Sequence, residues 1–137
     1  GKMPVYTNGT NGFVSVEDVA DICIQLMNSK THSERFIVVG ENISFKTYFE
    51  QIAKQLQVAP PKKALNKKIG YWLIALDWLL SKITKRKRGI TKENFRISIE
   101  NFKYSNEKIK HQLNYSFTPL ETIIANVAKQ IKQHERR

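Results

Sequence analysis

The sequence contains very little cysteine and no long apolar run. Cys23 is the only cysteine among 137 residues, which excludes an internal disulfide and a thiolate metal cluster. No apolar run approaches the roughly 18 residues that a membrane-spanning helix needs. Residues 1–5 contain no apolar segment typical of a signal peptide. These features favour a reducing compartment, and we expect a cytoplasmic protein.

The sequence also has few residues spaced as in known catalytic, metal-binding or dinucleotide-binding motifs. The histidines His32, His111 and His134 each lack a second His, Cys or acid at metal-ligand spacing. No G-x-S-x-G nucleophile signature occurs. Gly9-x-x-Gly12 precedes a strand pattern, whereas a dinucleotide fingerprint opens a helix, so we interpret it as a turn. We therefore predict no catalytic, cofactor-binding or metal-binding residue in this chain.

Tyr104 and Lys108 have the Tyr-x-x-x-Lys spacing with which short-chain dehydrogenases perform catalysis. That spacing requires both residues on one face of a helix, where the lysine cation lowers the pKa of the tyrosine. We expect Ser105 to be the N-cap of the helix, which places Tyr104 outside it. A packing role for Tyr104 is therefore the preferred interpretation.

Positive charge is concentrated in one segment. The formal net charge is +11, from 23 basic and 12 acidic residues. Between Lys54 and Arg88 there are ten Lys or Arg and one acid, Asp77, which leaves thirteen basic and eleven acidic residues elsewhere. This distribution indicates a local basic surface rather than a basic molecule.

Length and apolar periodicity predict one α/β domain with a single modest core. Residues 13–16 and 35–39 have the β-branched and aromatic composition of strands. A helix should follow each, the first capped by Ser15 with Asp18 as its capping-box acid and the second capped by Ser44. The expected buried faces are Val16, Val19, Ala20, Cys23, Leu26 and Met27, then Phe45, Tyr48, Phe49, Ile52, Ala53 and Leu56.

The remainder of the chain should be helical. Further helices are expected over residues 66–84, 91–100 and 105–113, and from a capping box at Thr118 and Glu121 to near the C-terminus. Phe95, Ile97 and Ile99 also alternate with the period of a strand, which is the alternative for the second of these segments. The last should bury Leu120, Ile123, Ile124, Val127, Ala128 and Ile131. The helix over 66–84 is apolar nearly all round, so it should be buried or pack against something outside the chain. The sequence thus predicts a mostly helical α/β fragment with two or three short strands.

Three motifs resemble segments of the extended short-chain dehydrogenase/reductases. Residues 12–20, GFVSVEDVA, resemble the F-V-x-V-x-D-V-A segment in the C-terminal half of that family. Residues 40–45, GENISF, are similar to its G-E-N-x-S strand exit. Residues 104–108, YSNEK, and 113–120, LNYSFTPL, resemble its ending, Y-S-N-E-K-A followed by L-G-Y-x-P-x-P-L-E. The motifs occur in the family's order and cover most of the chain.

The resemblance implies an NAD(P)-dependent oxidoreductase of the epimerase/dehydratase type. Its N-terminal Rossmann domain would bind NAD or NADP and carry the catalytic residues, so this chain would hold no cofactor. Residues 1–137 would be the C-terminal substrate-binding and lid portion of that Rossmann-type enzyme. A small-molecule substrate would lie between the two parts, under helices that follow Pro61. The residues implied to contact it are Tyr6, Asn8, Thr10, Asn11 and Phe13.

The residue at position 11 restricts the class of substrate that we expect. Nucleotide-sugar epimerases of this family usually have an arginine two residues before the strand's aromatic, where it grips the diphosphate. Asn11 stands there in this sequence, and Gly12 replaces the usual acid. The pattern resembles the dihydroflavonol-reductase-like and sterol-dehydrogenase-like branches, which act on smaller, less charged carbonyl or alcohol substrates.

The alternative function is a basic module that uses residues 62–88 to bind a membrane surface or a nucleic acid. Lysines flank a Trp- and Leu-rich helix, as in interfacial membrane helices. Such a helix should have a charged polar face, but Asp77 is the only charge between Ile69 and Leu80. The run from Lys85 to Arg88 contains no aromatic residue for base stacking, which disfavours nucleic acid.

Overall fold

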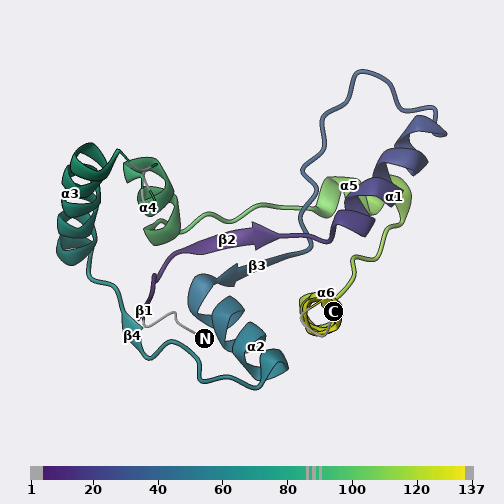
Figure 1. Ribbon diagram of the computed structural model, residues 1–137. Coiled ribbons are helices and arrows are strands. Elements are labelled where there is room, and N and C mark those ends of the chain that lie inside the picture. The colour runs from purple at the N-terminus through teal and green to yellow at the C-terminus, as the bar shows by residue number, and fades with distance from the viewer. Residues whose placement is uncertain (1–4, 86, 88, 90, 135–137) are drawn as a thin grey trace.

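The computed structural model describes residues 5–85, 87, 89 and 91–134. Its elements are β1 (Val5–Tyr6), β2 (Thr10–Phe13), α1 (Val16–Met27), β3 (Glu41–Ser44), α2 (Phe45–Leu56), β4 (Lys63–Ala64), α3 (Lys67–Thr84), α4 (Lys92–Ile99), α5 (Glu107–Leu113) and α6 (Leu120–His134). The fold is mixed α/β with helices predominating and few short strands, which confirms the predicted class (Figure 1).

Two short strand pairs organise these elements. β2 and β3 pair antiparallel at the centre, with Thr10 opposite Ser44 and Phe13 opposite Glu41. β1 and β4 pair in parallel nearby. Figure 1 shows α3 and α4 at one end of the molecule and α1 and α5 at the other, with α2 packed below β3. The segment from β1 to β2 therefore runs from the α3–α4 end toward α1.

The caps of the first two long helices confirm the sequence prediction. The Ser15 and Ser44 hydroxyls accept hydrogen bonds from the backbone N–H groups of Glu17 and Thr47, both at 3.1 Å. The Ser15 hydroxyl also donates to the Glu17 carboxylate, and this bond, together with one from the backbone of Glu17 itself, holds the pKa of that carboxyl below its usual value. Asp18 was expected in the capping box, but its buried carboxylate contacts residues near α6 instead.

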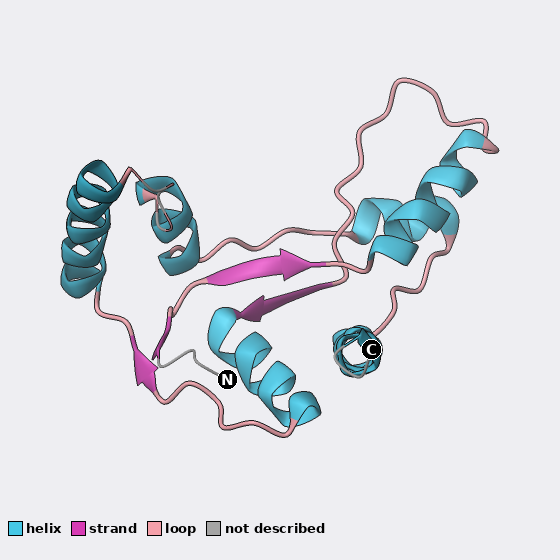
Figure 2. Cartoon of the chain, viewed as in Figure 1, coloured by secondary structure: helices cyan, strands magenta, loops and turns pink. Residues whose placement is uncertain are grey.

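The predicted strands were placed wrongly. Residues 35–39 form no strand in the described structure, and Figure 2 shows the whole connection from α1 to β3 as a loop. Pairing begins at Glu41, because β2 supplies a partner there. β2 itself covers Thr10–Phe13 rather than residues 13–16, so Gly12 belongs to a strand and not to the predicted turn.

The later helices begin close to their predicted positions. Asn66 and Thr91 cap α3 and α4 through their side chains, while α5 begins one residue later than expected, after Asn106. The capping box predicted for α6 is wrong. Glu41 Oε1 accepts the N–H of Leu120 at 3.0 Å, so a carboxylate 79 residues away satisfies the N-terminus of α6.

Buried apolar side chains form three small clusters between pairs of helices, and Val39 is buried beside Gly12 of β2. Ile22 of α1 and Ile109 of α5 are fully buried at one end. Ile74 of α3 and Phe95 of α4 are buried at the other end. The third cluster, between α2 and α6, comprises Ala53, Leu120, Ile124 and Ala128. With so few buried apolar residues, large apolar faces remain exposed.

Candidate functional site

The predicted substrate-contacting residues lie in β1, in β2 and in the connection between these two strands, which together we call the β1–β2 segment. Tyr6 is half-buried in β1, and its carbonyl accepts the N–H of Leu65 at 2.7 Å, just before α3. The Lys46 ammonium lies 5.8 Å from the centre of the Tyr6 ring. Asn8 is exposed in the connection to β2. This segment thus touches both α2 and the strand that leads into α3.

Thr10 and Asn11 are held at the centre of the fold. The Thr10 amide donates to the Glu100 carbonyl at 3.0 Å, and its carbonyl accepts the N–H of Phe102 at 2.9 Å. The backbone of Thr10 is therefore fixed, while its side chain is half-exposed. Asn11 Oδ1 accepts the N–H of Gly12 at 2.9 Å, and within the described residues its Nδ2 has no hydrogen-bond partner. The Asn11 amide can therefore donate to a carbonyl or hydroxyl oxygen of a ligand.

Phe13 has a packing role. Its ring stacks on Tyr48, with centroids 4.4 Å apart, and meets Phe45 edge-on at 6.0 Å. These contacts direct its side chain toward α2. The aromatic cluster therefore fixes the end of β2 and holds the preceding residues in position.

Both glycines of this segment stand where a side chain would not fit. A Cβ on Gly9 would lie 2.4 Å from the Ser98 carbonyl oxygen, and one on Gly12 would lie 2.4 Å from Val39 Cγ2. Gly9 also donates its N–H to that Ser98 carbonyl at 3.1 Å. Close packing against α4 and residue 39 therefore explains these glycines.

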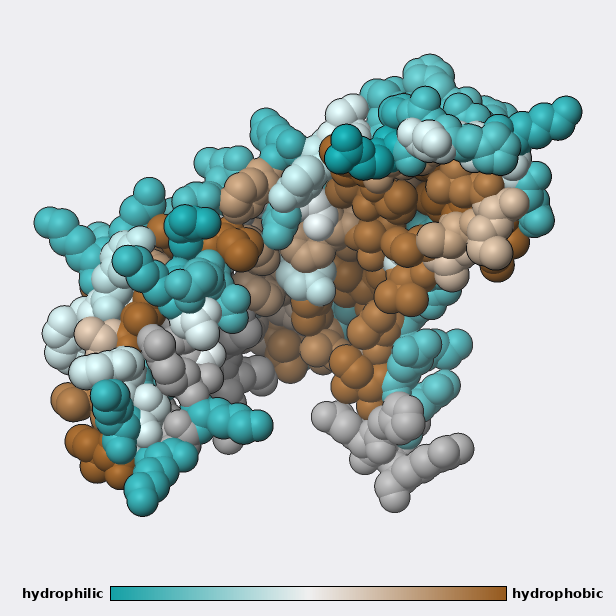
Figure 3. All heavy atoms as spheres, turned by 90° about the horizontal axis from the view of Figure 1, so that it is seen from above, coloured by the Kyte–Doolittle hydropathy of each residue, from teal (hydrophilic) through white to brown (hydrophobic). Residues whose placement is uncertain are grey.

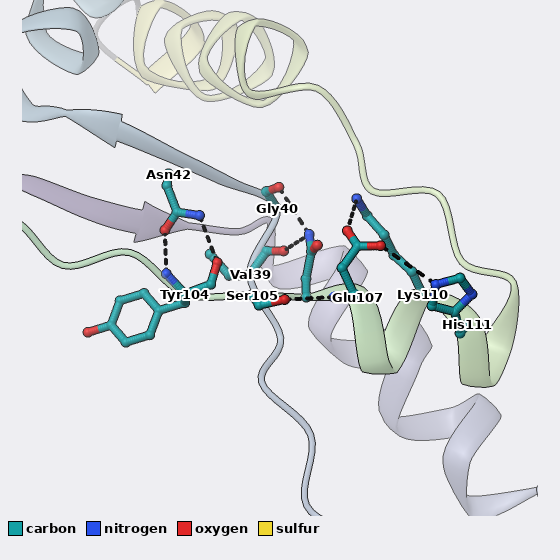
Figure 4. Close-up of polar contacts among 9 residues, drawn as sticks. Val39, Gly40, Asn42, Tyr104, Ser105, Glu107, Lys110 and His111 are labelled. Atoms are coloured by element: carbon teal, nitrogen blue, oxygen red, sulfur yellow. Dashed lines mark hydrogen bonds and ion pairs between the residues drawn. The ribbon is translucent and has the colours of Figure 1, made fainter.

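The Tyr104–Lys108 pair is not arranged for catalysis. Tyr104 lies before α5, as expected, and exchanges two hydrogen bonds with Asn42, shown in Figure 4. The Lys108 ammonium lies 2.5 Å from Glu34 Oε2 and 3.2 Å from the Arg35 carbonyl oxygen. Asn106, buried between these residues, donates to the Val39 carbonyl at 2.6 Å. The motif therefore tethers the loop between α1 and β3 to α5.

A second buried polar network joins α1 to the start of α6. Asp18, only 4% exposed, accepts hydrogen bonds from the Tyr115 hydroxyl at 3.2 Å, the Thr118 amide at 3.0 Å and the Thr118 hydroxyl at 2.8 Å. Burial, together with the Asp18 charge, raises the pKa of Tyr115 to about 12. No local pattern in the sequence indicates this network, since Asp18 lies about 100 residues from Tyr115 and Thr118.

An apolar groove opens between α2 and α6. Its volume is about 320 Å³, and it is lined by Phe13, Val14, Tyr48, Ile52, Leu56, Leu120, Ile123, Ile124, Val127, Ala128 and Ile131. Figure 3 shows apolar residues gathered in a central hollow of the molecule, with polar residues along the upper edge of the view. The burial predicted for Val127 and Ile131 is wrong: they remain 48% and 43% exposed, so the described residues cover α6 only partly.

The apolar face predicted for α1 is mostly exposed, contrary to expectation. Val16 is 80% and Met27 is 84% exposed, and the helix buries Asp18 and Ile22 instead. At 100° per residue the exposed apolar side chains fall within an arc of about 100°. We call this set the α1 stripe: Val16, Ala20, Cys23, Ile24 and Met27. The stripe therefore leaves a continuous apolar strip of α1 uncovered by the described residues.

Two of the three histidines lie at the surface. His32 and His111 are exposed, and the side chain of His134 lies outside the described residues. Among described residues, no group of three or more His, Cys, Asp or Glu is arranged to hold a metal ion. None of the described helices combines the length and apolarity needed to cross a membrane.

Comparison with known proteins gives one structural match. No family model matches the chain, and no curated protein matches at the significance required. The crystal structure of gox2253 matches with a TM-score of 0.74 and 25% sequence identity. The match covers 99% of this chain and 41% of the gox2253 chain. The chain thus spans less than half the length of the solved structure whose fold it shares.

Proposed function

We propose that this chain is the C-terminal substrate-binding portion of an extended short-chain dehydrogenase/reductase. The parent enzyme would be an NAD(P)-dependent oxidoreductase or epimerase that acts on a carbonyl or alcohol group, in the cytoplasm. The observation that carries the proposal is the exposed α1 stripe, which begins at Val16 within the motif GFVSVEDVA and continues beyond it to Met27. A nucleotide-binding domain outside the chain would cover it.

Two further observations support the proposal that the nucleotide-binding domain lies outside this chain. Residues 35–39 have a strand-like composition but no neighbouring strand among the described residues, and Ile37 is 53% exposed. An added sheet edge would give this segment its hydrogen-bonding partner. The match to 41% of the gox2253 chain is consistent with a longer protein that contains a second part.

The proposed substrate site lies along the β1–β2 segment. Tyr6, Asn8, Thr10, Asn11 and Phe13 would contact the substrate, and the aromatic cluster would hold Phe13 in position. Asn11 offers neutral amide donors, which suit a carbonyl or hydroxyl oxygen. A diphosphate would instead require cationic, bidentate donors at this position. We therefore favour a smaller, less charged substrate than a nucleotide sugar.

Fluorescence titration with NADPH and NADH tests the proposal. The isolated chain should bind neither, and a longer polypeptide that includes the upstream coding sequence should bind one of them. Binding of NADPH or NADH by the isolated chain would contradict the proposal that the cofactor binds to a domain outside this chain. So would an upstream sequence without a strand followed by a glycine fingerprint.

Asn11→Ala in the longer protein tests the substrate site. Loss of one neutral hydrogen bond should raise KM about two- to tenfold with unchanged cofactor affinity. Asn126→Ala, on an exposed position of α6, is the matched control and should change neither quantity. Equal effects of the two substitutions, or tight binding of a nucleotide sugar, would contradict the assignment.

A further inference from the structure

Helix α3 has one face packed and the opposite face bare. Gly70, Ile74 and Asp77 are its buried residues. A Cβ on Gly70 would lie 1.9 Å from Phe95 Cζ, which shows how closely α4 approaches. Tyr71 meets the Phe95 ring edge-on at 5.3 Å. Helix α4 therefore covers a single side of α3.

The bare face is strongly apolar. Trp72 is 66%, Leu79 is 50% and Ile83 is 71% exposed. Counted at 100° per residue, its side chains lie within an arc of about 100°, well away from the buried side. We call this set the α3 stripe: Ile69, Trp72, Leu76, Leu79, Leu80 and Ile83. Figure 1 shows α3 at the outer edge of the molecule, at the end opposite to α1.

Lysines surround the α3 stripe at both ends of the helix. Those that the structure describes are all exposed: Lys62, Lys63, Lys67, Lys68, Lys82, Lys85 and Lys87. Among described residues none of them forms an ion pair. Lys82 instead lies 5.0 Å from the centre of the Trp78 ring. Arg86 and Arg88, which belong to the same basic run, lie outside the described residues.

The sequence disfavoured an interfacial membrane helix because the helix lacks a charged face, and the position of α4 accounts for that lack. An isolated interfacial helix needs a charged face toward water, and between Ile69 and Leu80 the only charged residue of α3 is Asp77. Here α4 occupies the side that would otherwise face water. The apolar stripe is left free for a second environment, with cations at both ends.

We propose that α3 docks in the plane of an anionic membrane surface, with the α3 stripe inserted and the lysines against lipid headgroups. Basic residues near anionic lipid and a tryptophan at the interface are the chemistry that such a surface recognises. The α1 stripe has the opposite character, because α1 contains three acids and no basic residue. That contrast assigns a lipid partner to α3 and a protein partner to α1. The proposal does not depend on the proposed enzymatic function.

Vesicle co-sedimentation tests the binding itself. The chain should sediment with phosphatidylcholine–phosphatidylserine vesicles and only weakly with pure phosphatidylcholine. Leu76→Gln with Leu79→Gln should abolish binding and leave the helical circular dichroism unchanged, since both side chains are exposed. Lys67→Gln with Lys68→Gln should weaken binding roughly fivefold per charge. Lys103→Gln with Lys129→Gln removes the same charge from exposed positions elsewhere and should have a much smaller effect.

The two tryptophans report the orientation of the helix. Trp72 lies in the α3 stripe and Trp78 lies outside it, beside Lys82. In Trp78→Phe, brominated lipid should quench the remaining Trp72 strongly. In Trp72→Phe, it should quench Trp78 much less. Equal quenching in the two variants would overturn the proposed orientation.

Other partners give different results, and each would overturn the proposal. Failure to sediment with anionic vesicles at low salt would exclude a lipid surface. Concentration-dependent self-association that Leu76→Gln with Leu79→Gln removes would identify a second copy as the partner. Binding by this chain but not by the longer polypeptide would show that another part of the protein covers the α3 stripe.

Discussion

Substitution of Asp18 offers the most demanding test of the packing described here. Its buried carboxylate accepts three hydrogen bonds and ties α1 to the segment before α6. Asp18→Ala would leave the Thr118 amide and the hydroxyls of Tyr115 and Thr118 without this acceptor. An unsatisfied buried donor costs more than the net value of the bond that it made.

The expected loss can be estimated from the geometry. A hydrogen bond to a charged group contributes about 1.5–3 kcal/mol. Tyr115 and Thr118 are half-buried, so their hydroxyls can turn toward water, whereas the Thr118 amide is fixed. Counting the amide in full and the hydroxyls in part gives about 3–5 kcal/mol for Asp18→Ala. That is a large share of the about 5–15 kcal/mol that stabilises a typical domain.

Urea unfolding followed by circular dichroism measures this loss. With a slope of about 1–3 kcal/mol per molar urea, the midpoint for Asp18→Ala should fall by about 2 M. Asp18→Asn is the matched control, because its amide keeps one acceptor for Thr118 and can donate to the hydroxyl oxygens. It should cost about 1–2 kcal/mol. A loss below 1 kcal/mol for Asp18→Ala, or equal losses for both variants, would refute the reasoning.

Two further predictions concern Tyr115 and Gly70. The pKa of Tyr115 is raised from 10.0 to about 12, so its stabilising contribution should be complete below pH 10 and decrease as the pH rises toward 12. Thermal unfolding across this range should show that decrease, and Tyr115→Phe should remove it; an unchanged pH profile in Tyr115→Phe would contradict the assignment. Gly70→Ala should destabilise the α3–α4 pair by about 1–3 kcal/mol, because its Cβ would overlap the Phe95 ring. Gly89→Ala is the matched control, because the nearest atom to its added Cβ is 3.8 Å away. Equal losses of unfolding free energy in the two variants would argue against close packing at Gly70.

Local signals in the sequence were sufficient to predict the helices. Ser15, Ser44, Asn66 and Thr91 each cap a helix near its predicted start, because the interactions that define a cap span only two or three residues. The strands could not be placed in the same way. A strand exists only where another supplies its hydrogen bonds, so β3 pairs at Glu41 and not over the more apolar residues 35–39.

Burial was the least predictable property. Periodicity correctly identified an apolar face on α1, but it does not say whether the chain itself covers that face. Val16 and Met27 are apolar and exposed, whereas Asp18 is charged and buried. The role of Asp18 depends on Thr118, about 100 residues away, and no local pattern in the sequence indicates that contact.

The reactivity of Cys23 tests most directly whether a domain outside this chain covers the α1 stripe. Cys23 is the only cysteine in the chain, it is exposed, and it lies within the stripe. A maleimide, with the labelled site located by peptide mass spectrometry, should modify Cys23 rapidly in the isolated chain and far more slowly in the longer polypeptide. Ile24→Glu, beside Cys23 in the stripe, should restore rapid labelling in the longer polypeptide. Equally rapid labelling of Cys23 in the isolated chain and the unsubstituted longer polypeptide would contradict the proposal that the nucleotide-binding domain docks on α1.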